Sequence, residues 1–380
     1  MFKQSDVAPV PADALAATLA PFGMSRMLPR AAYVDPEVFE WEQRNIFSGW
    51  HCVGHASELD GVGAQRAVGS GANGILLVRD EDDVVRAFAN VCRHRGHELL
   101  ACGATTKRRG VVCPYHSWSF KLNGELRKAP GFDGLDPAEF GLTELRLVDW
   151  HGWLFVDPSG EDGDFAEHVA GTDEIISPYR PEDLTIVARH SYELATNWKV
   201  IAENYQECYH CSTIHPELSR ISPPTSGDNV ELSGNWMGGS MDLIAEAETM
   251  SLSGRSGGVA IKGLSEQELR TVMYLVGFPN LLVSLHPDYV MTHRMTPLAV
   301  DRTYVECTWA FPKDAAEKPG FDPAYAVDFW DLTNRQDWAA CESVQRGLSS
   351  PHAQPGPLAP DEEGVYQFVT RVARAYAGNR

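Results

Sequence analysis

The sequence Cys92-Arg93-His94 and the later sequence Cys113-Pro114-Tyr115-His116 stand in a part of the chain that is rich in short β-type runs. Each half combines one thiol with one imidazole. Asn123-Gly124 follows the run SWSFKL at 117–122 and is a strong signal for a two-residue hairpin turn. The pattern predicts a small β domain with the two Cys–His halves on two of its loops. Its other β-type runs are GILLV at 74–78, VVRAFAN at 84–90, GVVC at 110–113 and GWLFV at 152–156.

Two Cys and two His are the ligands of a Rieske [2Fe–2S] cluster, in which each iron takes two protein ligands. We expect Cys92 and Cys113 to bind one iron as thiolates, and His94 and His116 to bind the other through ring nitrogens. A structural zinc site is one alternative, but zinc sites favour Cys-x2–4-Cys pairs over mixed Cys–His halves. A chance match among 8 Cys and 13 His is the other, and the agreement of both halves counts against it.

A second group of metal-ligand residues is ECYH at 207–210 followed by His215. Residues 197–211 are predicted to form a helix that carries Glu203, Glu207 and His210 on one face. A solvated polar face is the ordinary explanation for such carboxylates. However, two imidazoles and one carboxylate, with coordination positions left open, form the ligand set of non-haem Fe(II) oxygenases.

The missing carboxylate ligand is predicted on a long helix at about residues 325–348. One mainly apolar stripe of this helix contains Asp337. A buried ionised group costs several kcal/mol unless it is paired or binds a metal, and a salt bridge to Arg is the alternative to a metal. We therefore predict that His210, His215 and Asp337 hold a mononuclear iron. The other residues of the stripe are Trp330, Asn334, Cys341, Val344 and Leu348.

The composition is that of a globular protein, with 43% hydrophobic and 22% charged residues, and 380 residues suffice for two domains. The N-terminus lacks a sustained apolar core, so we expect no signal peptide, no membrane span and a cytoplasmic location. The 8 Cys are therefore expected to be reduced thiols and metal ligands. A net charge of −20 argues against nucleic-acid binding and would suit a cationic substrate or a basic redox partner, although solubility alone accounts for it.

The rest of the chain mixes helix and strand patterns. A helix is expected after Asp35, with Pro36 at its first position. Strands are expected in the segments 184–194, 271–295 and 302–311. A Gly/Asp/Glu-rich stretch at 157–164 is typical of a domain joint. A last amphipathic helix carries Val365, Phe368, Val372 and Tyr376 on one stripe.

In these motifs the chain resembles the catalytic α subunits of the Rieske non-haem iron oxygenases. The resemblance covers nearly the whole length: the helix region near 37–47, the two Cys–His loops, ENYQECYHCSTIH at 203–215 and NRQDWAACESVQRG at 334–347. It implies an α+β fold with an N-terminal segment at 1–46 that packs with the catalytic domain. It further implies, in chain order, a β-rich Rieske domain at 47–158 and a catalytic domain at 159–380. The catalytic domain would contain a helix-decorated antiparallel sheet. It also implies a head-to-tail homotrimer, in which Glu207 bridges the cluster of one subunit and the iron of its neighbour.

The implied activity is that of a terminal oxygenase. It would use O2 and electrons from a separate NAD(P)H-dependent flavin and iron–sulfur reductase to hydroxylate a small organic substrate. Many family members have Asp at the position of Glu207, and Glu in the setting ENYxECYHC is similar to the subgroup that oxidises quaternary ammonium compounds such as choline, glycine betaine and carnitine. We therefore expect monooxygenation of a quaternary or N-methylated amine, with N-demethylation as the outcome.

Two alternative activities stay open at this point. The first is dioxygenation of an aromatic ring, and the second is electron transfer by a Rieske protein that lacks a second iron site.

The chain also offers residues for binding a cationic substrate. An aromatic cage for a cation could be lined by Trp236, Trp309 and Tyr289, although such residues equally pack ordinary cores.

Overall fold

The computed structural model describes residues 7–70, 73–230 and 232–378. The chain divides into two compact units. Residues 42–165 form the first, which we call the β unit, and residues 1–41 together with 166–380 form the second, which we call the mixed unit. Within the described ranges, no helix combines the length and the apolar character that crossing a bilayer requires.

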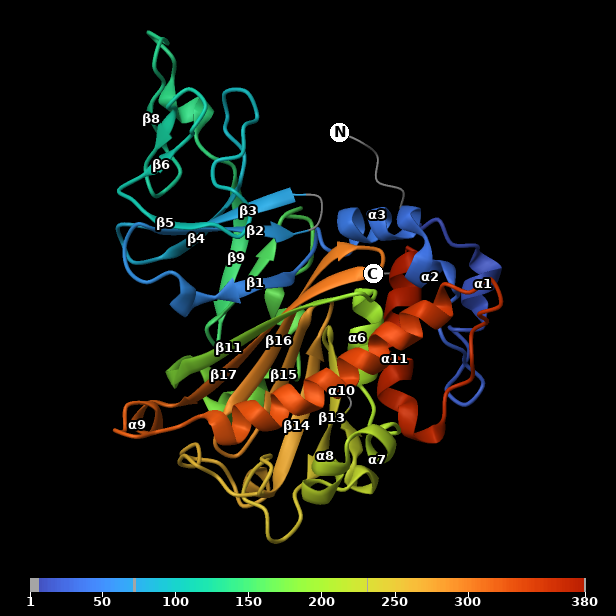
Figure 1. The fold of residues 1–380 in the computed structure, drawn as a ribbon. Helices are drawn as coiled ribbons and strands as arrows, with labels where there is room; N and C mark the ends of the chain where they lie inside the picture. Colours follow the sequence, from blue (N-terminus) through green and yellow to red (C-terminus); the bar gives the residue numbers. More distant parts are fainter. Residues whose placement is uncertain (1–6, 71–72, 231, 379–380) are drawn as a thin grey trace. The chain divides into compact units, whose positions relative to one another are not determined.

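The β unit is built on a seven-stranded antiparallel sheet in the order β1-β10-β9-β4-β3-β2-β5, and a three-stranded sheet has the order β6-β7-β8 (Figure 1). Successive side chains of a strand point to opposite faces, so Ile75 and Leu77 of β3 enter one apolar core and Leu76 and Val78 enter the other. The strands are β1 (His51–His55), β2 (Ala64–Ser70), β3 (Asn73–Arg79), β4 (Val85–Ala89), β5 (Thr105–Lys107), β6 (Val111–Val112), β7 (Ser119–Phe120), β8 (Leu126–Lys128), β9 (Glu144–Trp150) and β10 (Trp153–Asp157).

The mixed unit contains a seven-stranded antiparallel sheet in the order β11-β17-β16-β15-β14-β13-β12. The long helix α10 runs across this sheet (Figure 1). The strands are β11 (Leu184–Leu194), β12 (Asp228–Val230), β13 (Trp236–Asp242), β14 (Thr271–Gly277), β15 (Leu281–Leu285), β16 (Val290–Ala299) and β17 (Arg302–Pro312). The α-helices of the chain are α1 (Ala12–Ala16), α2 (Ala31–Val34), α3 (Pro36–Asn45), α4 (Phe165–His168), α5 (Asp173–Ile176), α6 (Trp198–Tyr205), α7 (Cys211–Ile214), α8 (Pro216–Ile221), α9 (Lys313–Ala316), α10 (Ala324–Leu348) and α11 (Glu363–Tyr376).

Strand register decides which side chains of this sheet face α10. Tyr274 of β14 pairs with Ser284 of β15, so the two side chains share one face. His293 of β16 pairs with Cys307 of β17, and both contact Asn334 of α10. We call the face that carries these residues the helix face of the sheet.

Most predicted elements are confirmed. Helix α3 begins at Pro36, α10 covers the predicted long helix, and α11 buries the predicted stripe of Val365, Phe368, Val372 and Tyr376. The segment 271–295 holds three strands, β14, β15 and β16.

Two predictions about helices are wrong. Helix α6 ends at Tyr205, six residues before the predicted end at Cys211. Val344 was expected on the buried stripe of α10 but is 48% exposed, and Gln345 is buried in its place. A stripe that repeats every 3.5 residues drifts around a helix of 3.6 residues per turn, which explains the second difference.

Candidate functional site

The Cys92 and Cys113 loops of the β unit share one backbone design. In each loop the cysteine N–H donates to the carbonyl five residues further along, at 2.8 Å. The residue four positions after each cysteine is left-handed, with φ of 70° at Gly96 and 58° at Ser117. The N–H of that residue donates back to the cysteine carbonyl, at 3.0 Å and 3.1 Å. These tight turns bring both thiols into the same apolar core, where Cys92 is 3% and Cys113 is 2% exposed.

The two histidines of these loops also lie together. The ring centroids of His94 and His116 are 4.7 Å apart, and His94 stacks on Trp118 at 5.0 Å with nearly parallel rings. The Nδ1 atom of His94 is buried and has no hydrogen-bond partner among the described residues. A buried nitrogen without a partner is costly unless it binds a ligand. Two adjacent thiols and two adjacent imidazoles therefore fit a [2Fe–2S] cluster with two protein ligands on each iron.

The second site begins where α6 ends. Asn197 caps the helix, since its Oδ1 accepts the N–H of Lys199 at 3.1 Å. The chain leaves the helix after Tyr205, so Glu207 and His210 lie on a turn rather than on the predicted helical face. Glu203 stays on the helix and accepts a hydrogen bond from the hydroxyl of Tyr33 at 2.7 Å. The predicted grouping of Glu203 with Glu207 and His210 is therefore wrong.

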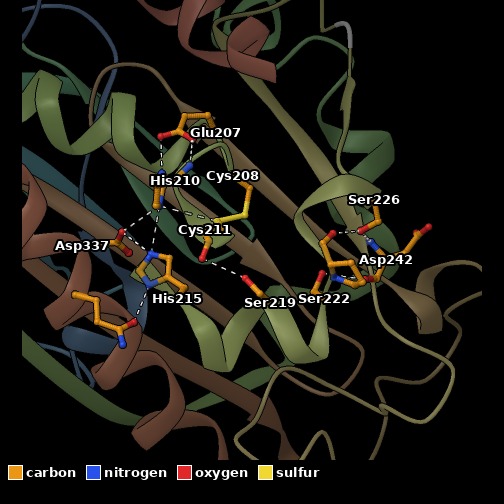
Figure 2. The surroundings of a disulfide bond; sticks show 12 residues. Glu207, Cys208, His210, Cys211, His215, Ser219, Ser222, Ser226, Asp242 and Asp337 are labelled. Atoms are coloured by element: carbon orange, nitrogen blue, oxygen red, sulfur yellow. Dashed lines mark hydrogen bonds and ion pairs between the residues drawn. A yellow bond between two sulfur atoms is a disulfide. The ribbon is translucent and has the colours of Figure 1, made fainter. Parts of the chain in front are cut away.

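His210, His215 and Asp337 come together in the mixed unit (Figure 2). The Nε2 atoms of the two imidazoles are 3.2 Å apart. The Oδ1 atom of Asp337 lies 2.8 Å from His215 Nε2 and 3.3 Å from His210 Nε2. One ligand atom of each residue lies within 4.8 Å of the others. Asp337 has no Arg partner among the described residues, so the alternative of an Arg salt bridge is not realised there.

The electrostatics of this group are those of a cation site. Burial acts to raise the pKa of Asp337, but hydrogen bonds from both imidazoles outweigh it and hold the pKa below its ordinary value. Burial acts to lower the pKa of His210, but its contacts with Asp337 and Glu207 raise it to about 9. The negative charge of the carboxylates thus favours positive charge at the imidazoles, which suits the binding of a divalent cation. Two imidazoles and one carboxylate, with room for further ligands, fit a mononuclear iron.

Each imidazole is oriented by a second residue. Glu207 accepts at Oε1 from His210 Nδ1, at 2.5 Å, and at Oε2 from the His210 backbone N–H, at 3.1 Å. Gln336 accepts at Oε1 from His215 Nδ1, at 2.7 Å. These bonds keep the proton on Nδ1 and leave Nε2 to face the other ligands. Glu207 was predicted from the sequence, whereas Gln336 was not, although its place directly before Asp337 was an available signal.

A disulfide joins Cys208 and Cys211, on either side of His210 (Figure 2). The expectation that the cysteines are reduced is therefore wrong for this pair, although the six other cysteines keep their thiols. The turn after α6 explains the difference, because it brings the two Cα atoms to 4.8 Å, within the range that a disulfide spans. The sulfur of Cys211 lies 4.0 Å from His210 Nε2.

Comparison with known proteins supports both sites. The chain matches the family model of the Rieske [2Fe–2S] domain over residues 49–139. It matches the model of the ring hydroxylating alpha subunit (catalytic domain) over residues 181–378, which is more than half of the chain. The first match thus contains the two Cys–His loops, and the second contains His210, His215 and Asp337.

Individual relatives and a solved structure also match this chain. The glycine betaine monooxygenase oxygenase subunit of Chromohalobacter salexigens is 30% identical over 374 residues, with 90% of this chain and 84% of the relative covered. The carnitine monooxygenase oxygenase subunit of Escherichia coli (strain K12) is 35% identical over 215 residues, which are 55% of each chain. A solved quaternary ammonium Rieske monooxygenase is 25% identical and superposes with a TM-score of 0.79 over 97% of this chain and 100% of its own. The chain therefore belongs to the Rieske non-haem iron oxygenases, as a catalytic α subunit whose cofactors are a Rieske [2Fe–2S] cluster and a mononuclear iron.

Proposed function

We propose that this oxygenase hydroxylates a small quaternary or N-methylated ammonium compound. The observation that carries the proposal is the glutamate at position 207, in the setting ENYQECYHC, which holds the iron ligand His210 through two hydrogen bonds. The similarity to glycine betaine and carnitine monooxygenases supports it and favours it over dioxygenation of an aromatic ring. The match to the catalytic-domain family counts against a simple electron carrier.

We assign the residues as follows. Cys92, Cys113, His94 and His116 hold the cluster, and His210, His215 and Asp337 hold the iron. When bound, the two groups supply electrons and activate O2. Glu207 accepts the Nδ1 proton of His210, which keeps the Nε2 lone pair directed at the site, and Gln336 does the same for His215.

The atoms of the proposed reaction balance as a monooxygenation. An N-methyl group, O2, two electrons and two protons give an N-hydroxymethyl group and one water. The hydroxymethyl group then loses its O–H proton as the C–N bond breaks, which releases formaldehyde and leaves the electron pair on the nitrogen of the demethylated amine. A separate NAD(P)H-dependent flavin and iron–sulfur reductase would supply the electrons, as the oxygenase-subunit names of the relatives support.

A head-to-tail homotrimer is part of the proposal. The solved relative is described in terms of inter-subunit electron transfer, which supports an oligomer in which Glu207 bridges the centres of neighbouring subunits. A cytoplasmic location stays a prediction from the sequence.

A substrate screen tests the function. The purified protein is combined with a Rieske-oxygenase reductase and NADH, and O2 uptake and formaldehyde release are measured with glycine betaine, carnitine, choline and an aromatic acid. We expect turnover of at least one ammonium compound and none of the aromatic acid. Turnover of the aromatic acid alone would show that the proposed substrate class is wrong.

A further inference from the structure

A cavity of about 200 Å³ lies in the mixed unit beside the C-terminal end of α10. Val344 of α10 lines it, and Asp337 lies seven residues earlier on the same helix. At about 1.5 Å per residue, these two residues are about 10 Å apart along the helix axis, so the cavity is separate from the iron ligands. Val344 is 48% exposed, so the cavity opens to solvent.

Hydrogen bonds hold the walls of this cavity in place. The side chain of Arg30, which lines it, donates to the carbonyls of residues 348, 349 and 350 at 2.8, 2.9 and 3.0 Å. The N–H of Met27 donates to the carbonyl of Gly356 at 3.0 Å. The segment before α2 is thus joined to the end of α10 and to the loop that follows it. The cavity is therefore formed before any ligand binds, which lowers the cost of binding.

One carboxyl group lines the cavity. Glu203 of α6 is 7% exposed, and its Oε1 atom accepts the hydrogen bond from Tyr33. Among the residues that the structure describes, this hydroxyl is the only hydrogen-bond partner of the carboxyl group, and no cation forms an ion pair with it. The Oε2 atom is therefore available to a ligand. A buried carboxylate is costly without a paired cation, so a ligand that brings a positive charge and a donor would stabilise it.

The charges around Glu203 determine its state in the empty cavity. Burial raises the pKa of Glu203 to about 8, although the hydrogen bond from Tyr33 and the charge of Lys199 act to lower it. Burial also raises the pKa of Cys341 on α10, so this thiol stays neutral. The guanidinium of Arg30 is engaged with the three carbonyls. At neutral pH the carboxyl group is therefore protonated, and it loses the proton when a cation binds.

The rest of the lining decides which class of cation fits. A metal ion such as Ca²⁺ takes six to eight oxygen ligands, which one carboxyl group in an apolar cavity cannot supply. A small alkylammonium ion needs one acceptor for its N–H, and its alkyl groups can be buried against apolar walls. The walls contain the apolar residues Met27, Leu28, Val344, Leu348, Ala353 and Pro355.

We propose that this cavity is a second binding site, which takes a small alkylammonium ion that carries an N–H, with Oε2 of Glu203 as the acceptor. Binding releases the proton of Glu203 to solvent and forms an ion pair in its place. A quaternary ammonium ion has no N–H, and demethylation creates one. Under the proposed function the site would thus distinguish product from substrate, but binding at the cavity does not depend on that function.

Three probes test the proposal on the intact holoenzyme. Trimethylammonium carries an N–H, tetramethylammonium has the same charge and similar alkyl groups without an N–H, and potassium has the charge alone. Binding is measured by anaerobic calorimetry between pH 6 and 8. Each titration is repeated in two buffers that differ in ionisation enthalpy, which gives the number of protons released.

Two variants and one control accompany the wild type. Glu203→Gln removes the charge and keeps the size of the side chain, and Ala353→Leu fills the cavity while leaving Glu203 unchanged. Glu246→Gln, at an exposed position, is the matched control. The visible absorption of the cluster and the iron content show that each variant is folded and loaded.

We expect trimethylammonium to release close to one proton per chain from the wild type at pH 7. This proton-coupled affinity should rise by about ten-fold per pH unit below pH 8 and level off above it, because the cation competes with the proton. At pH 8 it should be at least about ten-fold higher than the proton-coupled affinity for tetramethylammonium or potassium. Glu203→Gln and Ala353→Leu should each lose the proton-coupled binding, and Glu246→Gln should keep it.

The outcomes separate this inference from the proposed function. Proton-coupled binding that persists in Glu203→Gln or in Ala353→Leu, that is lost in Glu246→Gln, or that is equally tight for all three probes would overturn the inference. The absence of such binding in the wild type would also overturn it, and turnover of an ammonium compound in the substrate screen would leave the function standing. If no ammonium compound is turned over but trimethylammonium still displaces the Glu203 proton, the function is wrong and the binding site remains.

Discussion

The four proposed cluster ligands of the β unit come from two loops with the same backbone conformation, whereas the three proposed iron ligands of the mixed unit come from one irregular segment and one distant helix. In each cluster loop the cysteine and the histidine are no more than three positions apart, and hydrogen bonds inside the loop fix its backbone. The contact of His215 with Asp337 instead joins residues 122 positions apart in the sequence. The first site depends on local backbone geometry, and the second depends on α10 lying across the sheet. A substitution that abolishes one centre should therefore leave the other occupied.

The strongest test of this separation is Asp337→Asn. Loss of the carboxylate removes one of three iron ligands and leaves two imidazoles, so we expect loss of the mononuclear iron and a fall in turnover of at least about a thousand-fold. Iron per chain should drop from three to two, with the visible absorption of the cluster unchanged. Asp328→Asn, at an exposed position of the same helix, is the control. Loss of both centres would contradict the separation.

Glu207→Gln tests the residue that contacts an iron ligand without being one. The amide keeps an acceptor for His210 but carries no negative charge, so both centres should stay occupied while turnover falls about a hundred-fold. The reduction rate of the cluster and the rate of product formation in a single turnover are the measurements. Glu246→Gln, at an exposed position, is the matched control. Unchanged steady-state turnover would show that Glu207 does not bridge the two centres.

Gln336→Leu tests whether His215 depends on its orienting partner. Without the acceptor at Nδ1, His215 can change tautomer or rotate, and we expect iron affinity to fall about ten- to a hundred-fold. Competition with a chelator measures this affinity without any turnover. Gln336→Glu keeps an acceptor at the same place and should retain the iron. Equal iron affinity in Gln336→Leu and the wild type would show that packing alone orients the ring.

Glu203→Gln is expected to have the smallest effect on turnover and to act on stability instead. Burial raises the pKa of Glu203 to about 8 from an ordinary value of 4.5, although the bond from Tyr33 and the charge of Lys199 oppose the shift. Because the folded pKa is the higher one, the folded protein holds this proton more tightly. The contribution of this bound proton to the stability of the fold is complete below about pH 4.5, and it is lost as the pH rises through about 8.

The amide of the Gln variant cannot titrate, so the wild type should lose stability relative to the variant as the pH rises. The difference between their free energies of unfolding should shift in favour of the variant by up to about 1.4 kcal/mol per pH unit across this range. Denaturant unfolding between pH 5 and 8 measures the difference. Parallel pH curves for the two proteins would show that Glu203 is already ionised in the fold.

These features explain which parts of the protein could be predicted. The placement of Cys92 with His94, and of Cys113 with His116, could be predicted because each pair lies within one short loop. Asp337 was predictable because a regular helix places a carboxylate on an apolar stripe. The grouping of Glu203 with Glu207 was not predictable from helical periodicity, because the helix ends between them at Tyr205.

Contacts between elements that are distant in the sequence were beyond such reasoning. The partner of Glu203 is Tyr33, which is 170 positions away in the sequence. Tyr274 and His286 come together with Trp330 only because of strand register and the path of α10. Short-range patterns in a sequence do not contain that information.

The covalent link between Cys208 and Cys211 has a practical consequence for anyone who purifies this enzyme. It closes a small ring that contains His210, and reduction would release a thiol whose sulfur now lies 4.0 Å from the nitrogen intended for the metal. Thiolates are soft ligands that bind iron well. Dithiothreitol added to protect the cluster in one half of the protein would therefore alter the chemistry in the other half, and mercaptan-free buffers are the better choice for metal analysis.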